Sequence, residues 1–346
     1  MQAETTPLVW WQEVAGMAAV ALVVFGANFL VFVHMTWVER RVLAFMQFRL
    51  GPNRVGPIGI LQPWADAIKL LFKEEVLPAA ASKWAYLAAP VVAITTAFMA
   101  LAVVPYGPPF TLFGRQWQLQ VADLGVGILY IFAIGSLGVY GVVMAGWSAN
   151  NKWGLLGGLR SSAQMFSYEL SLGLSWVGLI LLAGSFKIND IIGHQAGWFW
   201  NWNAFVQFPA FVVYFIAACA EVARTPFDLP EGESELVAGF HTEYSSMSFG
   251  MMQIAEYINM ITVAVLAANL FLGGWNSGLP FLPSEGGLGF VWFLAKAAVV
   301  LFVFIWLRGT LPRFRYDQLM HFGWTVLIPL AVLNILGTAV VVVLFR

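Results

Sequence analysis

Long apolar segments, separated by shorter polar ones, recur along the whole chain of 346 residues. A helix needs about 20 residues, at 1.5 Å each, to cross the hydrocarbon core of a bilayer. The pattern therefore predicts an all-α integral membrane protein, a single domain with eight transmembrane helices. We place these helices near 14–38, 84–104, 125–147, 160–184, 204–223, 249–272, 288–308 and 322–345.

Basic residues are divided unequally between the two sets of connecting segments. Most of the 17 Lys and Arg residues follow the first, third, fifth or seventh predicted helix. Because Lys and Arg are enriched in short cytoplasmic loops, this side is predicted to be cytoplasmic, which puts both termini outside. The first cytoplasmic segment contains an amphipathic helix, 63–76. It is too short to span a bilayer, so we expect it at the membrane surface or under a partner protein.

The predicted cytoplasmic segment 224–248 contains a dense group of acids. Four of them fall within eight residues: Asp228, Glu231, Glu233 and Glu235. The flanking apolar segments add Glu221 and Glu256, and the fourth predicted helix contains Glu169. Ionisable groups cost roughly 2.5 to 3.5 kcal/mol each to insert into a membrane, and they usually mark a proton, ion or substrate path. We predict a ladder of carboxylates leading toward the bilayer centre, with Lys296 as the buried cation able to pair with it.

Crowded, desolvated carboxylates can share protons near neutral pH and titrate as a group, which is how a proton relay is built. Two simpler alternatives exist. A single acid in a membrane helix can be a protonated packing residue, and the acidic run can be a solvated turn or a divalent-cation site. The run lacks the spacing of an EF-hand loop. Acids on three helices beside four more in the segment favour the proton path.

Other side chains exclude several classes of site. The single cysteine, Cys219, excludes a disulfide framework and an iron–sulfur cluster ligated by this chain alone. The four histidines are far apart in sequence and none pairs at metal-ligand spacing. No phosphate-binding or dinucleotide motif is present. We therefore expect no metal, flavin, haem or iron–sulfur cluster on this chain, and no nucleic-acid partner. The position of His241 in the acidic segment is only a weak indication of a functional role.

Four sequence blocks resemble a family of membrane subunits of respiratory complex I, the family that includes mitochondrial NADH dehydrogenase subunit one. The first block spans 38–74 and includes GPNRVGP and GILQPWADAIKLLFKE. The second is GWSANNKWGLLGGLRSSAQMFSYE at 146–169, and the third, EVARTPFDLPEGESELVAGFHTEYS at 221–245, is long and highly specific. The fourth is RGTLPRFRYDQLMHFGW at 308–324. The resemblance runs from about residue 20 to the end.

This resemblance implies a subunit of NADH–quinone oxidoreductase that is catalytic only within the assembly, with NADH, flavin and iron–sulfur clusters on other chains. It implies a chamber for a quinone substrate, ubiquinone or menaquinone, lined or shaped by Arg40, Arg49, Asp66, Arg224, Phe227 and Asp228. It also implies a proton path to antiporter-like subunits, formed by Glu169, Glu221, Glu231, Glu233, Glu235, Glu243 and Glu256. Further implied partners are the hydrophilic redox-arm subunits, small membrane subunits and the lipid of a bacterial plasma (inner) membrane.

Two other functions compete with this interpretation. A related membrane subunit of energy-converting hydrogenases shares the fold and the carboxylates but lacks a true quinone chamber. The complete GPNRVGP and PFDLPEGESE blocks favour complex I over it. A free-standing proton-coupled transporter is disfavoured because the two halves of the chain show no internal repeat. One departure from the family is Gly138, where some members carry an acid. The Trp-rich segment 185–203 matches no function.

Overall fold

The computed structural model describes residues 10–112, 115–229, 237–283 and 286–345. The longer helices are α1 (Trp10–Met46), α3 (Lys83–Leu101), α4 (Gly127–Ser148), α5 (Lys152–Ala183), α8 (Phe208–Glu221), α10 (Ser246–Leu270), α11 (Gly286–Thr310) and α13 (Ile328–Phe345). Shorter elements are the helices α2 (Gln62–Phe72), α6 (Ile188–His194), α7 (Asn203–Val206) and α12 (Tyr316–Phe322), the 3₁₀ turns η1 (Pro57–Gly59), η2 (Phe199–Asn201) and η3 (Gly239–His241), and the π-helical turn η4 (Gly323–Leu327). Strands β1 (Phe110–Leu112) and β2 (Arg115–Trp117) form an antiparallel pair.

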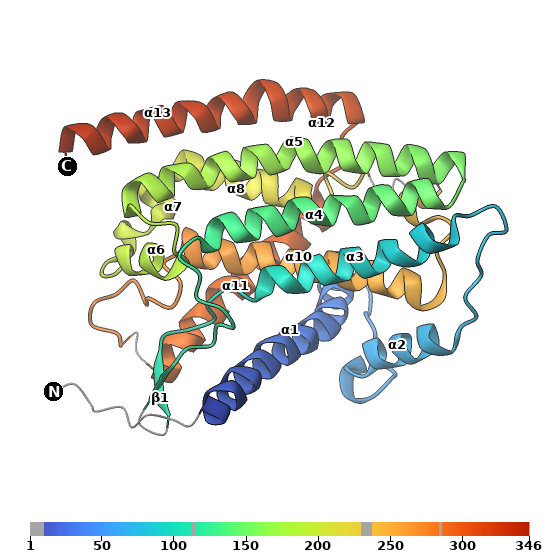
Figure 1. Ribbon diagram of the computed structural model, residues 1–346, viewed down its shortest axis with the longest axis horizontal. Helices are drawn as coiled ribbons and strands as arrows, with labels where there is room; N and C mark the ends of the chain where they lie inside the picture. The colour runs from blue at the N-terminus through green and yellow to red at the C-terminus, as the bar shows by residue number, and fades with distance from the viewer. Residues whose placement is uncertain (1–9, 113–114, 230–236, 284–285, 346) are drawn as a thin grey trace.

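The long helices form a bundle around α10. Helices α3, α4, α5 and α13 run side by side along the long axis, while α1 crosses the bundle at an angle (Figure 1). Every residue of α10 from Met260 to Leu270 is buried. By contrast, α13 packs against α5 and α8 only along one side, and much of its other side is exposed. The centre of the molecule is therefore the helix that carries Glu256.

Within the described residues, seven helices are long and apolar enough to cross a membrane. This agrees with an all-α membrane protein. Helix α8, in the predicted segment 204–223, has only 14 residues, or roughly 21 Å. It is short because the chain breaks at Gln207, and Pro209 lies in the first turn of α8. The count of eight spans and the outside location of both termini stay predictions.

Several helices extend beyond their apolar segments or end before the predicted limit. Helix α1 continues past residue 38 to Met46, and α5 begins at Lys152, eight residues earlier than expected. Asn151 caps α5, because its side chain accepts a hydrogen bond from the Trp153 amide. Glu169 consequently lies near the middle of α5. The amphipathic helix α2 ends at Phe72 rather than at 76.

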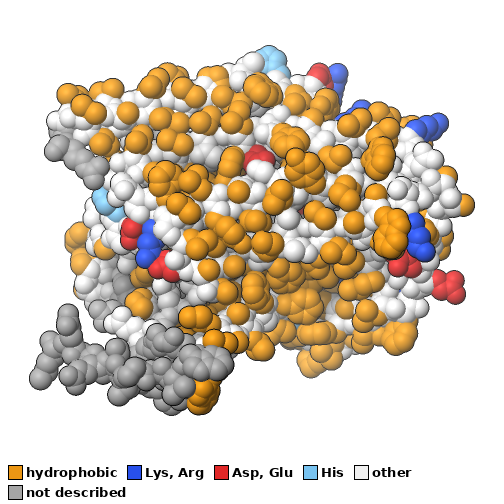
Figure 2. Space-filling view, in the orientation of Figure 1, with side chains coloured by type: hydrophobic (Ala, Val, Ile, Leu, Met, Phe, Trp, Pro, Cys, Tyr) orange, Lys and Arg blue, Asp and Glu red, His pale blue; other side chains and the backbone are white. Residues whose placement is uncertain are grey.

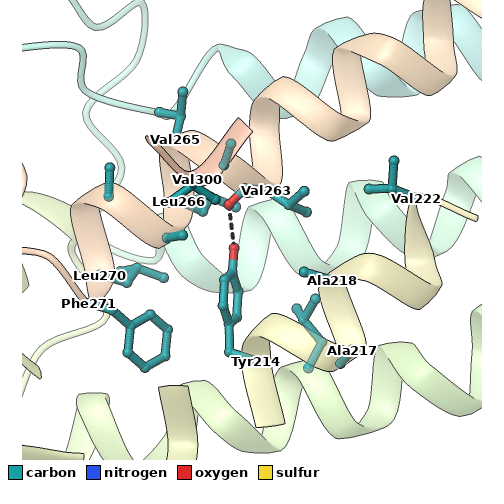
Figure 3. Packing of buried hydrophobic residues seen from close by; sticks show 14 of the residues in the cluster. Tyr214, Ala217, Ala218, Val222, Val263, Val265, Leu266, Leu270, Phe271 and Val300 are labelled. Carbon is teal, nitrogen blue, oxygen red and sulfur yellow. Dashed lines mark hydrogen bonds between the residues drawn. The ribbon is translucent and has the colours of Figure 1, made fainter. Parts of the chain in front are cut away.

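Small residues allow the short helix α8 to pack closely on its neighbours. Ala217, Ala218 and Ala220 are fully buried, and the hydroxyl of Tyr214 donates to the Val263 carbonyl of α10 at 2.6 Å (Figure 3). Close approach through small side chains is typical of helix packing in membranes. The hydrogen bond joins the middle of α8 to α10, and Glu221 ends α8 seven residues further along the chain.

The surface of the bundle is largely apolar. In Figure 2, hydrophobic side chains cover the middle of the visible face, and Lys and Arg gather mainly toward the right-hand end. The turn between α4 and α5 lies at this end in Figure 1, and so does α2. An apolar belt with charges toward its ends is the surface expected of a protein that resides in a bilayer.

Candidate functional site

Arg224 is the centre of a buried charged cluster. It follows α8 in a turn where Ala223 has a positive φ of 53°, and its amide donates to the Cys219 carbonyl. Its Nη1 lies 3.4 Å from Glu39 Oε1 of α1, and its Nε lies 3.3 Å from Glu256 Oε1 of α10. Its guanidinium lies 4.5 Å from the ring centroid of Tyr257. Burial opposes the charge, but the Glu256 and Glu39 carboxylates hold the pKa of Arg224 above its usual range.

Glu39 joins a second guanidinium to this cluster. Its Oε1 also accepts a hydrogen bond from Arg308 Nη1 of α11, and its side chain is almost completely buried. Two cations therefore share one acid, and Arg224 reaches the second acid, Glu256. Removing one member of such a buried group leaves an uncompensated charge, at a cost of about 3 to 5 kcal/mol. We call these residues the inner cluster: Glu39, Arg224, Glu256, Tyr257 and Arg308.

Two consecutive residues of α1 have different partners, because neighbouring side chains of a helix point about 100° apart. Glu39 points into the inner cluster, whereas Arg40 forms an ion pair of 2.7 Å with Asp66 of α2. Both side chains of that pair are partly exposed. Arg49 is exposed and donates to Gln47 at 2.7 Å. The structure thus joins two of the predicted chamber residues to each other, and places Arg49 with neither of them.

The other predicted chamber residues lie in the turn after α8. Gln164 of α5 donates to the Phe227 carbonyl at 2.8 Å, which holds this turn against the bundle. The Phe227 ring is buried between Tyr168, at 5.5 Å, and Phe314, at 5.7 Å. Asp228 pairs with Arg313 at 3.1 Å. Aromatic rings and charged groups are therefore adjacent on the same turn.

Two neighbouring cavities connect the carboxylates of α5, α8 and α10. The inner cavity has a volume of about 100 Å³, and its lining includes Thr96, Gly138, Glu221, His241, Gln253, Glu256 and Asn259. The central cavity has a volume of about 40 Å³, and its lining includes Glu169, Trp176, Glu221, Asn259 and Thr262. Glu221 and Asn259 line both cavities. Each cavity is large enough for water, which needs about 10 to 15 Å³ of such space.

Helix α4 passes between the acids at a glycine. A methyl group on Gly135 would lie 3.8 Å from Glu221 Oε1 and 4.0 Å from Glu169 Oε1, so both carboxylates approach one point. The adjacent Ser136 donates a hydrogen bond to Glu169 Oε1. Glu221 Oε2 is buried and has no hydrogen-bond partner within the part of the chain that the structure describes. This arrangement leaves room for protons to move by way of a bridging water.

The remaining predicted path residues lie apart from these cavities or cannot be placed. Glu243 accepts a hydrogen bond of 2.5 Å from Asn151 at the start of α5. Three acids, Glu231, Glu233 and Glu235, lie outside the described residues. The structure thus joins Glu169, Glu221 and Glu256.

Lys296 differs from the sequence expectation. Its Nζ donates to three backbone carbonyls just after α10, those of Leu272, Gly274 and Asn276, at 2.5 to 3.0 Å. It also lies 4.1 Å from the ring centroid of Trp202. Among the described residues, no acid pairs with it. The reason is that the chain folds back after α10 and brings its carbonyls to Lys296 at the C-terminal end of this helix, whereas Glu256 lies in its N-terminal half.

A family model described as NADH dehydrogenase matches residues 18–339, which is most of the chain. The chain belongs to this family. It is 52% identical over 328 residues to the H 1 subunit of the NADH–quinone oxidoreductase of Geobacter metallireducens, covering 95% of this chain and 96% of that protein. It is 49% identical to NADH–quinone oxidoreductase subunit 8 of Thermus thermophilus, covering 95% and 87%. The corresponding H subunit of Flavobacterium psychrophilum is 45% identical, with coverage of 95% and 97%.

Several residues of this site have no predicted site role from the sequence: Glu39, Ser136, Tyr257, Arg308 and Arg313. Glu39 offered one usable signal, since it is an acid at the end of an apolar segment and is followed by two arginines. Ser136 offered none, because a serine hydroxyl on a helix often bonds to the backbone of its own helix. Tyr257 offered none, because an aromatic residue in an apolar segment is usually a packing residue.

Proposed function

We propose that this chain forms the wall of a quinone chamber in a proton-pumping NADH–quinone oxidoreductase and transmits quinone reduction to a proton path. One observation carries the proposal. Arg224, predicted for the chamber, lies 3.3 Å from Glu256, predicted for the path. The two predicted sites therefore meet in one ion pair. The names of the relatives at about 50% identity support the reaction class.

The chemistry of quinone reduction gives this contact a function. Reduction in a closed pocket creates transient negative charge and requires two protons. Negative charge on the chamber side attracts Arg224 and weakens its pairing with Glu256. Glu256, once less well compensated in a partly buried site, then binds a proton. The aromatic turn at Phe227 and the Arg40–Asp66 pair suit a chamber that receives an apolar tail and a polar head.

The proton path proceeds from Glu256 through Glu221 to Glu169. The inner cavity joins the first two acids, and the central cavity joins Glu221 to Glu169. The acids Glu231, Glu233, Glu235 and Glu243 connect this path to the cytoplasmic side. Antiporter-like membrane subunits receive the signal from Glu169, and hydrophilic redox-arm subunits close the chamber at α2 and the turn 224–229. Lys296 is not a proton carrier in this scheme.

The proposed topology has eight spans in a bacterial plasma (inner) membrane, with both termini outside. It is tested with single cysteines at exposed positions that flank different helices. Arg54→Cys and Thr310→Cys should react with an impermeant thiol reagent only from the cytoplasm, and Phe281→Cys only from outside. Native Cys219 is buried and gives a low background. Labelling of Thr310→Cys and Phe281→Cys from the same side would contradict the topology, since α11 separates them.

The coupling role is tested with Arg224→Met in the assembled complex. We expect NADH–quinone activity to fall by at least about a hundredfold, since about 3 to 5 kcal/mol of charge compensation is lost. NADH–ferricyanide activity, which precedes the quinone step, should persist. Arg315→Met is the matched control, because Arg315 pairs with Asp317 on the surface. Normal quinone reduction by assembled Arg224→Met would refute the proposal.

A further inference from the structure

The inner cavity contains a titratable side chain that the proposed path does not use. Its lining brings together residues from α3, α4, α5, α8, α10 and η3, and η3 contributes Phe240 and His241. This imidazole is buried and shares the cavity with Glu221 and Glu256. Thr96, Gln253 and Asn259 add further polar groups to the lining. A cavity of about 100 Å³ that is lined by an imidazole and two carboxylates is a junction through which protons can pass.

The surrounding structure fixes the position of His241. The turn η3 lies against α5 at Gly157, where an added methyl group would come within 2.7 Å of the Gly239 backbone. The imidazole meets the rings of Phe240 and Phe249 edge-on, at 4.8 and 5.4 Å between centroids. These rings screen the imidazole, while the cavity remains open to it.

The residues that follow His241 anchor the same turn to other helices. The Tyr244 ring stacks on Tyr86 of α3 at 4.1 Å, and Glu243 accepts from Asn151. Glu243 is therefore occupied at the start of α5 rather than in the cavity. The titratable groups that share the cavity with His241 are Glu221 of α8 and Glu256 of α10.

Building on the proposed function, we propose that His241 transfers protons between Glu221 and Glu256 across the inner cavity. All three side chains belong to residues that line this cavity. A neutral imidazole accepts a proton on one ring nitrogen and releases the other proton from the second nitrogen. The released proton passes, directly or through water, to the Glu256 carboxylate, and the imidazole is neutral again. No electron moves and no other bond changes.

The test uses purified complex in liposomes, with NADH-driven quinone reduction and proton uptake as readouts. His241→Gln should lower both rates by about tenfold, less than a catalytic acid or base contributes, because cavity water carries part of the flux. His241→Ala should behave similarly, and added imidazole should restore at least half of its activity. Imidazole should not restore Glu256→Gln. NADH–ferricyanide activity reports assembly, and His194→Gln, in α6, is the matched control.

Different outcomes separate this inference from the proposed function. If His241→Gln has wild-type turnover across the pH range in which histidine titrates, or if imidazole fails to restore assembled His241→Ala, His241 is a packing residue. If Glu256→Gln is inactive in the same experiment, such a result for the His241 variants overturns the role of His241 and leaves the proposed function standing. If Glu256→Gln itself turns over normally, the proposed path is wrong, and the role of His241 is overturned with it.

Discussion

The inner cluster and the site around Lys296 each contain a basic side chain withdrawn from solvent, Arg224 almost completely and Lys296 in part, and the two sites balance this charge differently. Arg224 is compensated by the carboxylates of Glu39 and Glu256. Lys296 is compensated by three backbone carbonyls and by the face of Trp202. Both arrangements provide partners for a charge that would otherwise be costly to bury. The Lys296 site lies at the C-terminal end of α10, and Glu256 of the inner cluster lies in the N-terminal half of this helix.

The two sets of partners differ in whether their own charge can change. A carboxylate changes its charge when it binds a proton, so the position and pairing of Arg224 respond to protonation and to nearby negative charge. Backbone carbonyls and an indole ring have no accessible change of charge. The partners of Lys296 therefore form a clamp of fixed charge on the chain that follows α10, whereas in the proposed function the partners of Arg224 form a switch.

Glu39→Gln should have the largest effect, because it removes the acid that Arg224 and Arg308 share. Two guanidinium groups then lie close together without their common partner, at a cost of about 3 to 5 kcal/mol. We expect NADH–quinone activity to be lost while NADH–ferricyanide activity persists. Asp317→Asn, which alters a surface pair, should leave both activities unchanged. Wild-type quinone reduction by Glu39→Gln would show that the inner cluster does not depend on this acid.

Gly135→Val tests whether the acids need the space between them. The added side chain occupies the point that the carboxylates of Glu221 and Glu169 both approach. We expect proton pumping and quinone turnover to fall together by about tenfold, since water can no longer bridge the two acids. The control is Gly337→Val, because nothing lies within 4 Å of an added methyl group at Gly337. Equal rates for the two variants would contradict a path past Gly135.

Lys296→Met tests the clamp. It leaves three carbonyls without their donor and removes a cation–π contact, so the structure should lose about 2 to 4 kcal/mol. The loss is measured as faster thermal inactivation of the purified complex. Turnover of the intact complex should remain close to that of the wild type. Lost turnover with unchanged thermal inactivation would place Lys296 in the proton path after all.

Lys187→Met should have the smallest effect. Lys187 pairs with Asp123 at 2.6 Å, but both side chains are more than a third exposed, so the pair is worth less than about 1 kcal/mol. The hydrogen bond from Lys187 to Asp123 raises the pKa of Lys187. The stabilisation from this pair is fully present below the ordinary lysine pKa, and it is lost as the pH rises through the raised pKa of Lys187. The difference in thermal inactivation between variant and wild type should therefore be small at neutral pH and vanish in strong alkali. If the difference in thermal inactivation between variant and wild type grew in alkali, the assigned role of the Lys187–Asp123 pair would be contradicted.

The acids on three helices were predictable because apolar segments make each of them conspicuous. Glu169, Glu221 and Glu256 lie in or beside such segments, and the structure brings them to two adjoining cavities. Their depth was less predictable. Hydropathy marks only the apolar part of a helix, so the start of α5 at Lys152 was not anticipated.

The pairing of the cations could not be read from the pattern. Which acid Arg224 meets depends on the turn at Ala223, and the contact of Glu39 depends on how α1 crosses the bundle. Lys296 lies well inside α11 in sequence, yet its partners come from the segment that folds back after α10. Such contacts depend on how neighbouring helices are rotated about their axes, and the order of residues along one helix does not give that rotation.

Infrared difference spectroscopy of the assembled complex observes the central event directly. Spectra are taken before and after NADH-driven reduction of a bound quinone, in the region of protonated carboxyl groups. We predict a carboxyl signal that is absent in Glu256→Gln, strongly reduced in Arg224→Met and unchanged in Lys296→Met. The same carboxyl signal in wild type, Glu256→Gln and Arg224→Met, with normal turnover in all three, would show that the charge on Arg224 is not coupled to proton uptake by Glu256.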